Sequence, residues 1–80
     1  MLRIAKQTNR RPDDVITNAA QFFGPGGVGL TVSHRASDHI SLEGGGGFVT
    51  VSVAGIDHKT DVTAVTREWE SDVQRFLESL

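Results

Sequence analysis

The chain has 80 residues, a formal net charge of −2 and no cysteine. This length suffices for one domain, residues 1–80, and is too short for two. The lack of cysteine excludes disulfide bonds, thiolate catalysis and cysteine-bound zinc. No apolar run approaches the ~20 residues that span a bilayer, and residues 1–6 lack the apolar core of a signal peptide, so we expect a cytoplasmic protein without membrane contact.

The first two predicted elements are a strand and a helix. In residues 2–8, the set Leu2, Ile4 and Lys6 alternates with the set Arg3, Ala5 and Gln7, which fits the period of two that is typical of a strand. Residues 12–23 carry an apolar stripe at helical spacing. Pro12 suits the first helical position, two aspartates follow in the first turn, and Gly24 ends the predicted helix.

The next segments, residues 28–36, 39–43 and 48–55, predict three strands, and four glycines join the last two. With a two-residue turn at Gly45 and Gly46, apolar residues meet on one side of this hairpin and polar residues on the other. The expected pairs are Leu42 with Val49, Ile40 with Val51, Ser41 with Thr50 and His39 with Ser52.

A three-residue loop at positions 36–38 is predicted for the preceding hairpin, because it opposes Val32 to Leu42. The same register opposes His34 to Ile40 and places this histidine, partly buried, on the apolar side of the sheet.

The C-terminal part predicts a strand and a second helix. A turn at residues 56–59 places Val53 opposite Val62 in a fifth strand over about residues 60–67. The last helix is expected at about residues 72–80, with Ser71 as its N-cap in a capping box. We place Trp69 at the junction between this strand and this helix.

These elements predict an α+β fold in the order β-α-β-β-β-β-α, with one antiparallel five-stranded sheet and two helices packed on one face. The sequence of residues 11–15, Arg-Pro-Asp-Asp-Val, and the pair Glu68-Trp69 before a C-terminal helix also stand out. Together with the element order they resemble the helix-grip fold of START domains, polyketide cyclases and the birch-pollen allergen family. The element order alone also resembles one repeat of TATA-binding protein.

The two resemblances imply different ligands. A helix-grip fold implies a small-molecule cavity under the last helix, but here that helix is short, which argues against a deep cavity. A TATA-binding-protein repeat implies DNA on the sheet face, but the net charge and the mixed, hydroxyl-rich face argue against nucleic acid.

Motifs for catalysis or cofactor binding are lacking. Gly24, Gly26 and Gly29 fit the spacing GxGxxG, but a helix precedes them and a strand follows, the reverse of a dinucleotide site. The histidines lack metal-ligand spacing, and the carboxylates suit solvated helix ends. We therefore predict no catalytic residue, no metal and no cofactor.

The leading hypothesis is a non-enzymatic binding or protein-interaction module, with a homodimer as one form of it. Its predicted partner face consists of Thr31, Ser33, Arg35, Ser41, Glu43, Thr50 and Ser52. The alternative is a small-molecule binder or cyclase-like protein on a reduced helix-grip fold. Its predicted pocket wall consists of Phe48, Trp69 and Phe76.

Overall fold

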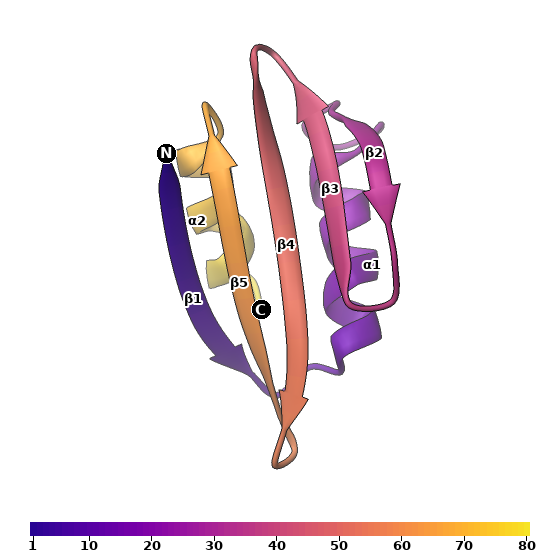
Figure 1. Ribbon diagram of the computed structural model, residues 1–80, viewed down its shortest axis with the longest axis vertical. Helices are drawn as coiled ribbons and strands as arrows, with labels where there is room; N and C mark the ends of the chain where they lie inside the picture. Colours follow the sequence, from indigo (N-terminus) through magenta and orange to yellow (C-terminus); the bar gives the residue numbers. More distant parts are fainter.

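Seven elements make up the fold in a computed structural model of residues 1–80 (Figure 1). They are β1 (Leu2–Thr8), α1 (Pro12–Phe23), β2 (Thr31–Arg35), β3 (His39–Gly44), β4 (Gly47–Ile56), β5 (Lys59–Arg67) and α2 (Glu70–Glu78). The strands form one antiparallel sheet in the order β1-β5-β4-β3-β2. Helix α1 packs on β3 and β4, and α2 packs on β5, both behind the sheet in the view of Figure 1. The predicted fold class and element order are confirmed.

The hydrophobic core lies between the sheet and this helix layer. Fifteen buried residues form one cluster, to which α1, α2 and the inward side of the sheet all contribute. The two helices meet through Phe23 and Phe76, which are both buried and whose ring centroids lie 5.3 Å apart. Phe22 packs against Phe76 from the outer side, with ring centroids 5.6 Å apart. Neither helix has the length and apolarity that crossing a membrane would require.

The β3–β4 and β4–β5 hairpins confirm the predicted registers. Leu42 lies opposite Val49, and Ser41 lies opposite Thr50. Gly45 and Gly46 adopt φ values of 59° and 80°, the left-handed conformation that a tight two-residue turn requires. At the other end of β4, Val53 lies opposite Val62, as alternation predicts.

Strand β2 departs from its prediction. It begins at Thr31 rather than at residue 28, and its register against β3 shifts between Val32 and His34. Val32 lies opposite Leu42 as predicted, but His34 lies opposite Ser41 instead of Ile40. A β-bulge inserts one extra residue, and one extra residue turns every later side chain to the other side of the sheet. His34 is consequently exposed, and the prediction of a partly buried histidine was wrong.

Helix α2 begins at Glu70, so the predicted capping box with Ser71 as N-cap was also wrong. Trp69 holds the N-cap position, and its indole Nε1–H donates a hydrogen bond of 3.0 Å to the carbonyl oxygen of Gly44. Glu68 enters this junction with a φ of 78°. The hydrogen bond between Trp69 and Gly44, in the four-glycine turn, therefore fixes where α2 begins. This contact overrides the local capping preference of Ser71.

Candidate functional site: the open face of the sheet

One side of the five-stranded sheet carries no helix. We call it the open face, and in Figure 1 it points toward the viewer. Its members follow from strand alternation: Val49, Val51 and Val53 of β4 are buried against the helices, so the residues between them point outward. Cross-strand pairs extend the same side over the sheet. The open face includes Arg3, Ala5, Thr31, His34, His39, Ser41, Glu43, Phe48, Thr50, Ser52, Thr63, Val65 and Arg67.

A charged and aromatic row crosses one end of this face. Glu43 of β3 lies opposite Phe48 of β4, and Phe48 in turn lies opposite Arg67 of β5. Because neighbouring strands are about 4.8 Å apart, Glu43 and Arg67 stand on either side of the Phe48 ring at about 10 Å from each other. Both charged residues are exposed, and the ion pairs of the chain involve neither of them.

The centre of the open face carries short hydroxyl side chains and one valine. The hydroxyl oxygens of Ser41 and Thr50 are 3.2 Å apart, in hydrogen-bonding distance across β3 and β4. Thr50 lies opposite Val65, and Ser52 lies opposite Thr63. Such short side chains give a nearly flat surface, on which a second flat surface can pack closely.

Two residues of the predicted partner face lie elsewhere. Beyond the bulge, Arg35 lies opposite Ile40 and points to the helix side, where its guanidinium donates a hydrogen bond of 3.4 Å to the Thr17 hydroxyl of α1. Ser33 sits at the bulge itself, and its hydroxyl donates a 3.1 Å bond to the backbone oxygen of Ser41. Thr31, Ser41, Glu43, Thr50 and Ser52 are on the open face as the alternation predicts.

The bulge brings His34 beside His39 on the open face. Their rings stack with centroids 4.8 Å apart and an interplanar angle of 16°. His39 Nδ1 is 3.0 Å from the carboxylate of Asp38, and this hydrogen bond lowers the pKa of Asp38 below its usual range. No group of three or more histidine or carboxylate side chains converges as metal ligands would, here or elsewhere in the chain.

The predicted pocket wall is not assembled. Phe48 is on the open face, whereas Phe76 is buried on the opposite side of the sheet among the helix aromatics. Trp69 packs over the glycine turn and bonds to Gly44. Alternation alone requires this separation, because Phe48 precedes the inward-facing Val49.

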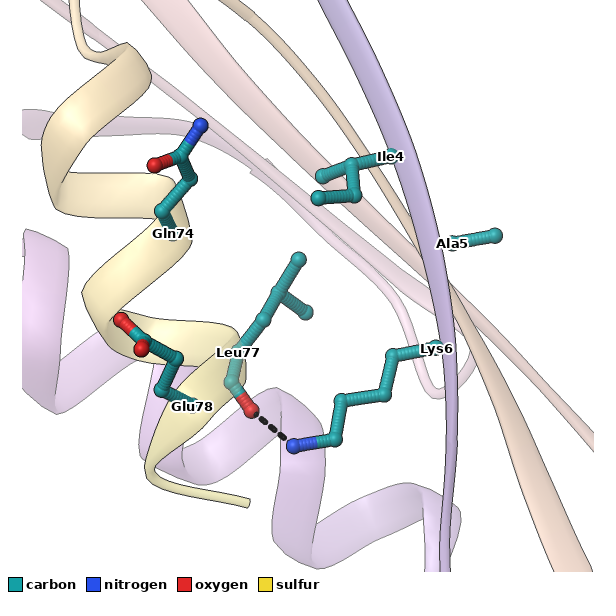
Figure 2. A pocket seen from close by; sticks show the side chains of 6 residues that line it. All are labelled: Ile4, Ala5, Lys6, Gln74, Leu77 and Glu78. Carbon is teal, nitrogen blue, oxygen red and sulfur yellow. Dashed lines mark hydrogen bonds between the residues drawn. The ribbon is translucent and has the colours of Figure 1, made fainter.

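The helix side instead carries a groove between β1 and α2, with a volume of about 310 Å³ (Figure 2). Ile4 and Lys6 point into it, and Ala5 between them points away. The Lys6 ammonium donates a 2.7 Å hydrogen bond to the Leu77 carbonyl oxygen in the last turn of α2. This lysine therefore caps a helix C-terminus, where a cation is favourable. It forms no ion pair with Glu78, which also lines the groove.

Comparison with protein-family models, with curated proteins and with solved structures gives no match for this chain. The open face is the largest group of side chains in this chain that neither the core nor the hydrogen bonds of the fold account for.

Proposed function

We propose that residues 1–80 act as a non-enzymatic protein-interaction module whose binding surface is the open face of the sheet. The single observation that supports it best is the row of Glu43, Phe48 and Arg67, which places an outward aromatic between two charges that have no ion-pair partner in the chain. Aromatic residues and arginine are the usual anchors of protein interfaces.

The flat hydroxyl-rich centre supports the same proposal. Binding a small molecule requires a concave site, whereas the pleated surface around Thr50 and Ser52 suits sheet packing. The element order resembles that of a TATA-binding-protein repeat and of the helix-grip fold. From these resemblances the proposal takes only a binding role for a sheet that carries helices on one side.

Site-specific photocrosslinking tests this proposal. A photoreactive residue replaces Thr50 on the open face, and a control replaces Gln21, which is exposed on α1. After irradiation in cells that express the protein, we expect a discrete protein adduct from position 50 and none from position 21. The adduct should disappear when Phe48→Asp is added to a chain that still folds by circular dichroism. Equal adducts at both positions, or none at position 50, would refute an interaction surface on the open face.

A further inference from the structure

The open face is self-complementary about the central strand. We propose that its occupant is a second copy of this chain, packed face to face about a twofold axis that runs parallel to β4. This inference rests on the proposed function, because it uses the same surface, and it names the partner.

The order of the strands makes the open face symmetric about β4. β4 is flanked by β3 on one side and by β5 on the other (Figure 1). A twofold axis above β4 and parallel to it lays each β3 over the β5 of the second copy. Residues at equal height on β3 and β5 then face each other, and each β4 residue of the open face meets its own equivalent.

The opposite charges of Glu43 and Arg67 match under this operation. Glu43 and Arg67 are at equal height, because both lie beside Phe48 in the ladder. Each Glu43 therefore faces the partner's Arg67, which gives two ion pairs per dimer, and the two Phe48 rings meet between them. Aligned sheet packings keep their strand directions within about 30° of each other, and an axis parallel to β4 satisfies this condition.

The area of the open face sets the expected strength of the dimer. Five strands about 4.8 Å apart and three to four rows of side chains about 7 Å apart give a footprint of roughly 500–700 Å² per copy. Stable dimers commonly bury about 800 Å² per partner, so this face supports a weak, reversible dimer with a dissociation constant on the order of 0.1 mM.

Charge reversal at the two matched positions tests the arrangement in sedimentation-velocity experiments. We expect the wild-type chain to be largely dimeric at about 1 mM and monomeric at about 10 µM, as a constant on the order of 0.1 mM requires. Glu43→Arg and Arg67→Glu should each weaken self-association at least about tenfold, because each replaces two attractions by two repulsions. Glu78→Arg makes the same charge change on exposed α2, on the other side of the sheet, and should leave association unchanged.

Mixing the two reversed chains is the decisive step. Each alone is repelled by its own copy, but a pair made of one Glu43→Arg chain and one Arg67→Glu chain restores both ion pairs. We expect a heterodimer whose dissociation constant is within about threefold of the wild-type value, a margin of less than 1 kcal/mol. Attraction between Glu43 and Arg67 within one chain cannot produce this result.

The outcomes separate the two proposals. A wild-type chain that stays monomeric at 1 mM, or reversed chains that do not combine, overturns the twofold dimer. If position 50 still crosslinks a different protein, the open face remains an interaction surface with another partner. If position 50 crosslinks nothing, the proposed function fails as well.

Discussion

The tetraglycine turn offers a sharp test of the packing at the end of the open face, because its members are glycine for different reasons. At Gly47, an added Cβ would overlap the Arg67 carbonyl oxygen and lie 2.7 Å from the Glu68 Cβ. At Gly46, an added Cβ would meet nothing within 4 Å, but the backbone has a φ of 80°. Gly47→Ala and Gly46→Ala therefore make the same chemical change against two different obstacles.

The two substitutions destabilise the fold through different physical effects. For Gly46→Ala, the left-handed conformation costs about 1–2 kcal/mol, and the stiffer unfolded chain offsets part of this, so we expect a loss of about 1 kcal/mol. For Gly47→Ala, β4 must move away from β5, where the Thr66 hydroxyl donates a 2.8 Å hydrogen bond to the Phe48 carbonyl oxygen. Losing this bond and the adjoining strand pairing costs about 3 kcal/mol or more.

Thermal unfolding followed by circular dichroism measures both changes. A loss of 1 kcal/mol lowers the melting temperature of a domain of this size by about 4–8 °C, so Gly47→Ala should lower it by about 12 °C or more. Gly46→Ala is the matched control and should lower it by about 4–8 °C. If Gly47→Ala melts no lower than Gly46→Ala, the close approach of β4 and β5 at this position is wrong.

Three further substitutions test other contacts. Trp69→Phe removes the hydrogen bond to the Gly44 carbonyl oxygen and should lower the free energy of unfolding in urea by about 1–2 kcal/mol; an unchanged value would show that this bond does not anchor α2. His58→Gly should raise that free energy by about 0.5–1 kcal/mol, because His58 has a φ of 67° in the β4–β5 turn, and a decrease would contradict this reasoning. The hydrogen bond from His39 lowers the pKa of Asp38 in the folded chain below 3.8, its value in the unfolded chain. The stability that this bond contributes should therefore be fully present above pH 3.8 and be lost as the pH falls through the lower, folded-state pKa. Comparing wild type with Asp38→Asn between about pH 6 and pH 3 should therefore show a stability difference that shrinks with acid, and a difference that grows would refute it.

The parts of the fold that sequence predicts well are those in which two strands constrain each other. In the β3–β4 hairpin, both strands alternate, so a shift by one residue would bury serine and expose leucine. Strand β2 lacks this constraint, because all five of its residues are exposed and most are polar on both sides. Nothing in its sequence opposes a bulge, and the bulge decides that His34 joins the open face while Arg35 leaves it.

The start of α2 was predicted wrongly for another reason, because it depends on a contact between segments that are distant in sequence. The Trp69 indole finds its acceptor in Gly44, on a turn 25 residues away, and this contact sets where the helix begins. Local capping rules contain no such information. The separation of Phe48 from Phe76 could have been predicted, since the register that places Val49 inward places Phe48 outward.

The open face also allows binding to be measured apart from folding. Glu43 and Arg67 are exposed and form no ion pair within the chain, and exposed charges of this kind change stability by less than about 0.5 kcal/mol when replaced. Phe48 is only half-buried, in contrast to the fully buried Val49 beside it. Charge reversal at positions 43 and 67 should therefore leave the melting temperature within a few degrees of wild type while association changes at least about tenfold. A chain that loses association and stability together would instead show that the row belongs to the fold, and the case for an interaction surface there would end.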